Sequence, residues 1–247
     1  MNVRDRSPLA VERLIVIAAL MTLCALSWAC LWAVPMPMPV MDTRVSPGFV
    51  LLRFLMWFIM MLAMMTPANL PAVLLFHRVV QNSSAPLLRT MLFAGGYFAA
   101  WGAFSLLATA LQFGLSQVRL INDAGAAQTA VMIAGLLAAI GIYQWIPLKN
   151  RCLEHCRSPI DFLTRHFRPR VLGASIMGLS HGLYCVGCCW LLMLLLFAGG
   201  VMNLLWIAGI TPVIVVEKLL TRGRVTQRLI GSGLVIAAGV VTIVSLW

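Results

Sequence analysis

The sequence predicts an all-α integral membrane protein: a bundle of about seven transmembrane helices forming a single domain over residues 1–247. Hydrophobic residues make up 62% of the chain and charged residues only 10%, which is too little polar surface for a soluble domain of this length. Apolar runs of about 20 residues recur, and each is long enough to cross a bilayer. The runs are continuous and do not alternate with a period of two, which excludes a transmembrane β-barrel.

Seven apolar runs define the expected membrane spans. They cover roughly 14–34, 49–70, 91–115, 128–147, 171–198, 203–219 and 229–247. Between the first two runs lies a proline-methionine segment, 35–41, which cannot be helical because prolines alternate through it. His77, Arg78 and Arg89 are expected in the loop after the second run, and Gly199-Gly200 is expected to form a tight turn before the sixth.

The distribution of charge predicts the orientation of the bundle. The net charge is +11, but the basic residues lie between the apolar runs, which indicates membrane topology and argues against a nucleic-acid partner. With the N-terminus in the cytoplasm and the C-terminus outside, 15 of the 18 basic residues fall on the cytoplasmic side. This set includes Lys149 and Lys218; only Arg44, Arg53 and Arg119 fall outside.

A short amphipathic helix is expected in the long connection between the fourth and fifth runs. Ser158 would cap its start, followed by Pro159 in the first turn and Asp161 as the reciprocal cap. Its apolar face would consist of Ile160, Leu163, Thr164 and Phe167. Such a helix would lie on the membrane surface; the alternative is a solvated loop with a chance cap.

The fifth run contains the residues that point most directly to chemistry. On a helix, His181, Cys185 and Cys188 share one face, and Cys189 flanks it. Thiolate and imidazole groups are ligands for Cu(I), zinc and iron–sulfur centres. A single buried cysteine commonly packs as a small hydrophobic residue, but three within five residues after a histidine favour a metal site.

A second candidate ligand set follows the fourth run. Cys152, His155 and Cys156 have i, i+3 and i+4 spacing and could face one way on a helix. At the cytoplasmic end of a span, these thiols would stay reduced. The set is interpreted as a second metal site or a relay point, with reduced surface thiols as the alternative.

Methionines and one carboxylate could support these ligands. Thioethers are soft ligands that suit Cu(I), although methionine also fills apolar cores. The candidates are Met64, Met65 and Met177, with Met36, Met38 and Met41 in the proline-methionine segment. Glu217, near the end of the sixth run, needs a partner at that depth, which could be a histidine, an arginine or a metal-bound imidazole.

Other classes of function lack their motifs. The chain has no phosphate-binding glycine loop and no His-Glu-x-x-His pattern, so we expect no enzymatic turnover. Seven cysteines, an odd number without a regular framework, argue against a disulfide scaffold.

Several sequence blocks resemble a bacterial family of metal-binding integral membrane proteins of unknown function, some of whose members are described as copper chaperones. The blocks are 63–67 (AMMTP), 141–149 (GIYQWIPLK), 152–159 (CLEHCRSP), 181–190 (HGLYCVGCCW), 202–206 (MNLLW) and 217–218 (EK). The similarity covers most of the chain from about Trp57 onward, leaving out the first run and the proline-methionine segment. It implies metal handling in the bacterial inner membrane.

The leading hypothesis is a membrane protein that binds, delivers or transports a soft metal, most plausibly Cu(I), with zinc as another thiophilic candidate. Its partners would be the lipid bilayer, the metal ion and a copper enzyme or metallochaperone. The alternative is a transmembrane thiol–disulfide carrier, because Cys185 and Cys188 have the two-residue spacing of redox pairs.

Overall fold

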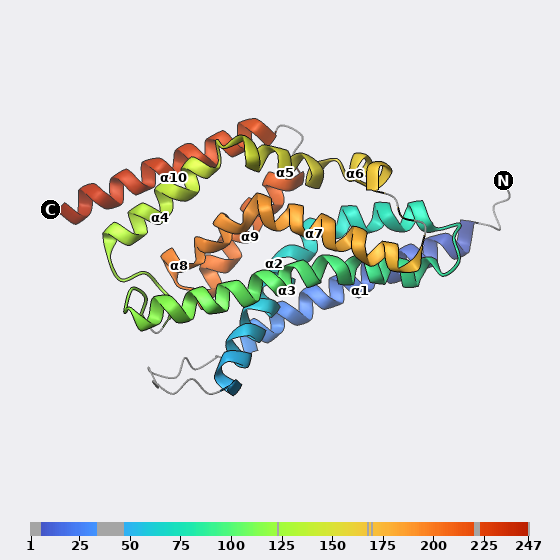
Figure 1. Cartoon of the computed structure of the whole chain (residues 1–247), viewed down its shortest axis with the longest axis horizontal. Helices are drawn as coiled ribbons and strands as arrows, with labels where there is room; N and C mark the ends of the chain where they lie inside the picture. The colour runs from blue at the N-terminus through green and yellow to red at the C-terminus, as the bar shows by residue number, and fades with distance from the viewer. Residues whose placement is uncertain are drawn as a thin grey trace.

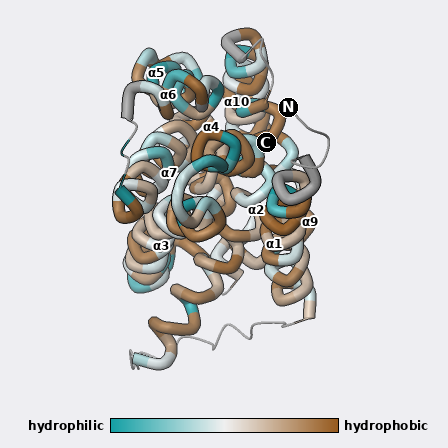
Figure 2. The backbone as a smooth tube through the Cα atoms, turned by 90° about the vertical axis from the view of Figure 1, so that its right-hand side faces the viewer, coloured by the Kyte–Doolittle hydropathy of each residue, from teal (hydrophilic) through white to brown (hydrophobic). Residues whose placement is uncertain are grey.

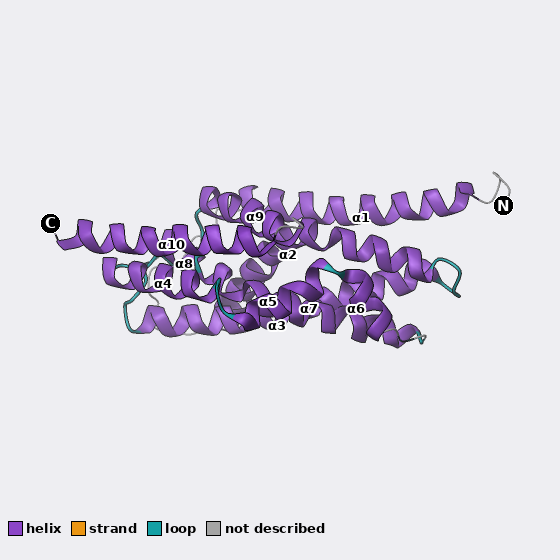
Figure 3. Ribbon diagram, turned by 90° about the horizontal axis from the view of Figure 1, so that it is seen from above, coloured by secondary structure: helices purple, strands orange, loops and turns teal. Residues whose placement is uncertain are grey.

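The structure is a computed structural model, and it describes residues 6–33, 47–122, 124–166, 168, 170–219 and 223–246. These residues are almost entirely helical (Figures 1 and 3). The helices are α1 (Arg6–Ala33), α2 (Pro47–Val80), α3 (Pro86–Gln117), α4 (Ala130–Tyr143), α5 (Pro147–Arg157), α6 (Pro159–His166), α7 (Val171–Leu194), α8 (Leu196–Gly199), α9 (Leu204–Leu219) and α10 (Gly223–Leu246). The predicted all-α class is therefore confirmed.

Five of these helices are long and apolar enough to cross a membrane: α1, α2, α3, α7 continued through α8, and α10. A sixth span results if α4 and α5 count as one, although the chain bends by 65° between them. The helix α9 has 16 residues, fewer than the roughly 20 that a span usually needs. The described residues thus support five or six spans, and a count of seven stays a prediction.

The second helix extends further than the sequence predicted. Pro67 and Pro71 lie inside α2, which continues to Val80. Apolar helices tolerate internal prolines when neighbouring helices and hydroxyl side chains satisfy the freed backbone groups. The expected loop position of His77 and Arg78 was therefore wrong, because both lie in the last turn of α2. Arg89, also expected in that loop, lies in α3.

The centre of the bundle is the packing of α3 against α7, which is the most extensive helix pair among the described residues. α1 and α2 pack together beside α3, and α4 packs against α10 (Figures 1 and 2). Gly178 on α7 touches the backbone of Phe93, and Gly96 on α3 touches the backbone of Ser175. Glycines on both helices let the two backbones approach, as in other membrane helix pairs.

Adding a methyl group at Gly178 is expected to destabilise the protein. The new Cβ would overlap the carbonyl group of Phe93, which is backbone and cannot rotate away. We expect Gly178→Ala to lower the free energy of unfolding by about 1–3 kcal/mol, the usual cost of overpacking. Unfolding of the purified protein in mixed micelles measures this, with Gly95→Ala as control, since a Cβ added there would meet no atom within 4 Å beyond its own stretch of helix. Equal effects of the two substitutions would contradict this account of the packing.

The connection between α5 and α7 contains the expected short helix, α6. Ser158 belongs to the end of α5 as well as to the start of α6. Its amide donates to the carbonyl oxygen of Glu154, and its own carbonyl oxygen accepts from the amide of Phe162. Phe162 and Leu163 are buried and Ile160 is exposed. The location of α6 on a membrane surface stays a prediction. Phe167 and the proline-methionine segment 35–41 lie outside the described residues.

Candidate functional site

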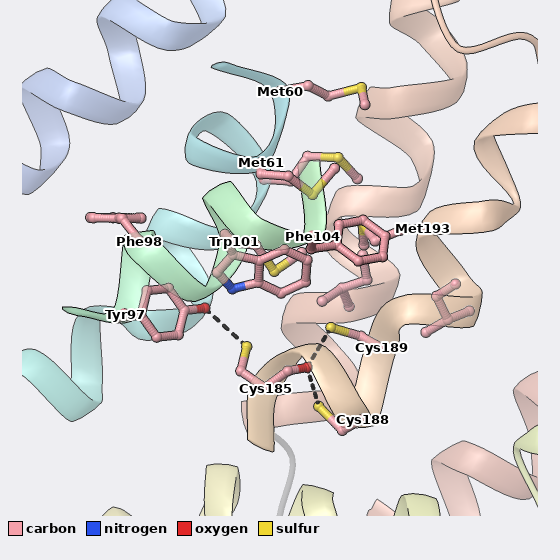
Figure 4. Packing of buried hydrophobic residues seen from close by; sticks show 14 of the residues in the cluster. Met60, Met61, Tyr97, Phe98, Trp101, Phe104, Cys185, Cys188, Cys189 and Met193 are labelled. Atoms are coloured by element: carbon pink, nitrogen blue, oxygen red, sulfur yellow. Dashed lines mark hydrogen bonds between the residues drawn. The ribbon is translucent and has the colours of Figure 1, made fainter. Parts of the chain in front are cut away.

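The three cysteines of α7 lie in the buried middle of the bundle. Cys185, Cys188 and Cys189 are each only 1–2% exposed. The thiols of Cys188 and Cys189 both donate to the backbone carbonyl oxygen of Cys185, at 3.0 and 2.9 Å (Figure 4). One turn of helix therefore presents three sulfur atoms, as the spacing predicted, with Trp101 and Met193 close by in the core (Figure 4).

The sulfur of Cys185 is contacted from two other helices. The Tyr97 hydroxyl on α3 lies 3.0 Å from Cys185 Sγ, and the Lys218 ammonium on α9 donates to the same sulfur at 2.7 Å. Lys218 is 6% exposed, so its charge is buried beside the thiol. Cys185 is thus the point where α3, α7 and α9 meet through polar groups.

All three members of the second ligand set face α7. Cys156 Sγ lies 3.9 Å from Cys188 Sγ, and Cys152 Sγ lies against Gly187, 3.1 Å from where a Cβ would stand. The ring of His155 stacks on Tyr184 at 4.2 Å between centroids, and its Nδ1 contacts the carbonyl oxygen of Arg151.

The bend between α4 and α5 brings α5 against α7. Pro147 begins α5 after the 65° bend. Tyr143, the last residue of α4, donates a hydrogen bond from its hydroxyl to the carbonyl oxygen of Gly187 on α7. Gly187 has no side chain, so α5 can place Cys152 directly against α7. This helix contact places Cys156 beside Cys188 and Cys152 beside Gly187.

His181, one helical turn before Cys185 on α7, is surrounded by aromatic side chains. Its ring lies among aromatic rings, 5.2 Å from Phe162, 5.8 Å from Tyr97 and 6.0 Å from Phe93 between centroids. Its Nδ1 atom is buried and has no hydrogen-bond partner. Within the described part of the chain, no three His, Cys, Asp or Glu side chains meet closely enough to hold a metal ion.

Glu217 forms a buried ion pair that the sequence did not predict. Its Oε1 lies 2.6 Å from Nζ of Lys149, and both side chains are almost fully buried. Lys149 also donates to Oε1 of Gln144 at 2.5 Å. The expectation of a histidine, arginine or metal-bound imidazole as the partner of this carboxylate was wrong. The Arg157 guanidinium donates to the backbone carbonyl oxygen of Glu217, from Nε at 3.0 Å and from a second nitrogen.

The candidate methionines lie in the core, in different environments. Met64 and Met65 are fully buried on α2, and Met65 Sδ lies 3.6 Å from the ammonium of Lys218. Met177 is buried on α7, where its sulfur accepts from the backbone amide of Arg168 at 3.3 Å. Met65 is therefore the methionine associated with the polar groups around Cys185. Met36, Met38 and Met41 lie outside the described residues.

Sequence reasoning missed the two buried lysines because it assigned Lys149 and Lys218 to cytoplasmic charge. Both lie at the ends of apolar runs, where a snorkelling lysine and a buried one look alike. Glu217 could have indicated a buried lysine, because a carboxylate near the hydrocarbon boundary requires a cation as its partner. Removing these two lysines from the 15 cytoplasmic basic residues leaves 13 against three, so the charge bias keeps its direction.

Comparison with known proteins gives one match. No curated protein sequence and no solved structure is significantly similar to the chain. The family described as PpoB2, copper chaperone, matches residues 54–241, which is well over half of the chain and includes all the candidate cysteines from Cys152 to Cys189. The resemblance inferred from the cysteine blocks is confirmed, and the chain belongs to the PpoB2 family of copper chaperones.

Proposed function

We propose that the protein binds Cu(I) as cargo at the contact between α5 and α7 and delivers it within the membrane to a copper-requiring partner. The observation that supports this most directly is the 3.9 Å separation of Cys156 Sγ and Cys188 Sγ, contributed by two different helices. A metal–thiolate bond is about 2.3 Å long for zinc, so two sulfurs this far apart can both bind one ion. Cu(I) is soft and prefers thiolate ligands.

A site of few ligands suits a protein that passes its metal on. Cys185 and Cys189 lie within one turn of Cys188 and could add a third sulfur after rotation about χ1. His181 lies one turn before Cys185 and keeps an unpartnered Nδ1, which could supply an imidazole. Cys152 and His155 lie on the same side of α5 as Cys156, where incoming or departing Cu(I) could be held.

The experiment that tests this function is copper analysis of the purified full-length protein. After reconstitution with Cu(I) under reducing conditions, we expect bound copper that resists removal by a weak chelator. The triple variant Cys185→Ser, Cys188→Ser, Cys189→Ser should not retain it. Equal copper retention by the triple variant and the natural protein would refute the thiol site.

Lys218 is expected to weaken copper binding and so to assist release. Its ammonium lies 2.7 Å from Cys185 Sγ, and a cation arriving at that sulfur must displace it against charge repulsion at short range. We expect Lys218→Met to raise Cu(I) affinity by about tenfold, equivalent to about 1.4 kcal/mol. Competition with a Cu(I) chelator measures the affinity, and Lys218→Arg, which keeps the charge, should stay close to the natural protein. A Lys218→Met protein with weaker binding would show that the lysine supports the site.

The proposed orientation places the N-terminus in the cytoplasm and the C-terminus outside, in the bacterial inner membrane. It rests on the charge bias. It predicts that a reporter enzyme that works only outside the cytoplasm is active when fused after residue 247. The partner receiving the metal would be a copper enzyme or a metallochaperone.

The alternative function is a thiol–disulfide carrier. Trapping the cysteines in their cellular oxidation state distinguishes it from copper delivery. A carrier should form a reversible Cys185–Cys188 disulfide during turnover and a mixed disulfide with its partner. Copper delivery predicts that all three thiols of α7 stay reduced in cells and react with an alkylating reagent after denaturation.

A further inference from the structure

A pocket lies between α1 and α2, away from the cysteines, at the end of the bundle where α1 begins and α2 ends. It has a volume of about 830 Å³. Apolar side chains of α2, including Leu70 and Leu74, line it. Arg13 of α1 and Arg78 of α2, both exposed, border it together with Gln81. The pocket therefore combines apolar lining residues with two arginines at one end of the helices.

Glu12, which precedes Arg13 on α1, pairs with His77, a residue that also borders the pocket. Glu12 Oε2 lies 3.8 Å from Nε2 of His77, whose Nδ1 is 3.0 Å from the hydroxyl of Thr90. His77 is 4% exposed, so its side of this contact is buried. The rim keeps the positive charge of Arg13 and Arg78.

A second groove runs along the other side of α2. It lies between α2 and the short helix α6, has a volume of about 200 Å³ and is bordered by Leu75, Val79, Ile160 and Leu163. Leu75 borders both hollows, so only the α2 backbone and its side chains separate them. Arg78 borders the first pocket and directly precedes Val79, which borders the groove.

We propose that this end of the bundle binds one anionic diacyl phospholipid. Arg13 and Arg78 bind the phosphate headgroup, one acyl chain occupies the pocket between α1 and α2, and the other occupies the groove between α2 and α6. Basic pockets between membrane helices bind anionic headgroups, and each arginine near the surface adds attraction. Two apolar hollows flanking one charged rim match two acyl chains better than a partner helix, which would need one continuous groove. The proposal does not depend on copper binding.

Native mass spectrometry of the full-length protein, released from detergent, tests this proposal. We expect phosphatidylglycerol to be retained about tenfold more than phosphatidylcholine with the same acyl chains. The double variant Arg13→Gln, Arg78→Gln should abolish the preference. The matched control Arg151→Gln, Arg170→Gln removes two exposed arginines that do not border either hollow and should keep it. Equal loss in both double variants, or no preference in the natural protein, would overturn the proposal.

Two further measurements test which ligand is bound and whether the double variant is still folded. Millimolar inorganic phosphate should not displace bound phosphatidylglycerol, and a single-chain lysophosphatidylglycerol should be retained less than the diacyl lipid. Displacement by phosphate, or equal retention of the single-chain lipid, would contradict a two-groove lipid site. The melting temperature of Arg13→Gln, Arg78→Gln in lipid-free detergent should match that of the natural protein, which separates lost binding from lost folding.

Discussion

Replacing Cys188 with serine is expected to lower Cu(I) affinity by at least about 100-fold. Cys188 contributes the sulfur that faces Cys156 at 3.9 Å, and a hydroxyl is a hard ligand that Cu(I) does not accept in its place. Loss of groups that merely support a metal ligand commonly costs 10–100-fold, so loss of a ligand itself should cost more. Equilibrium competition with a Cu(I)-specific chelator measures the change, and Cys156→Ser should give a loss of similar size.

The control for this experiment is Cys30→Ser, because Cys30 is a partly buried cysteine on α1 and lies outside the candidate site. It should leave Cu(I) affinity unchanged. If Cys156→Ser retains full affinity while Cys188→Ser loses it, α5 takes no part and the site belongs to α7 alone. Full affinity in both variants would refute the proposed pair.

Breaking the buried ion pair between Lys149 and Glu217 is expected to cost the most stability. The charged atoms are 2.6 Å apart, and the two side chains are 0% and 2% exposed. Glu217→Leu would leave the Lys149 ammonium buried without its carboxylate, although Gln144 still accepts one hydrogen bond. Removing one partner of a buried pair typically costs about 3–5 kcal/mol. Unfolding in mixed micelles measures the free energy.

The double variant Lys149→Met, Glu217→Leu is the decisive comparison for this ion pair. Replacing both charges by apolar groups of similar size is often close to neutral, since no unpaired charge stays behind. We therefore expect the double variant to regain most of the stability lost in Glu217→Leu. Additive losses from the two substitutions would contradict a direct interaction.

Much of the fold could be predicted from the sequence because apolar runs in lipid must satisfy their backbone groups as helices. The all-α class followed from this rule. The course of α2 could not, because whether Pro67 and Pro71 end a helix depends on neighbours that sequence does not show. The same holds for the span count, since the fourth run forms only the 14-residue α4, and the chain bends by 65° before α5.

The candidate site was predictable in its residues but not in its arrangement. The spacing placed Cys185, Cys188 and Cys189 on neighbouring faces of one helix, where the structure has them. The approach of Cys156 to Cys188 joins residues 32 positions apart and depends on how α5 docks after the bend. Helical periodicity gives no information on such a contact. The burial of Lys218 beside Cys185 depends in the same way on the packing of α9.

X-ray absorption at the copper edge of the Cu(I)-loaded protein tests the central claim most directly. We expect a Cu(I) edge and a first shell of two or three sulfur atoms at about the 2.3 Å typical of metal–thiolate bonds. The sulfur shell should be lost in the variant Cys156→Ser, Cys188→Ser. A first shell of oxygen or nitrogen atoms, or a sulfur shell that survives in that variant, would contradict a copper site at the contact of α5 and α7.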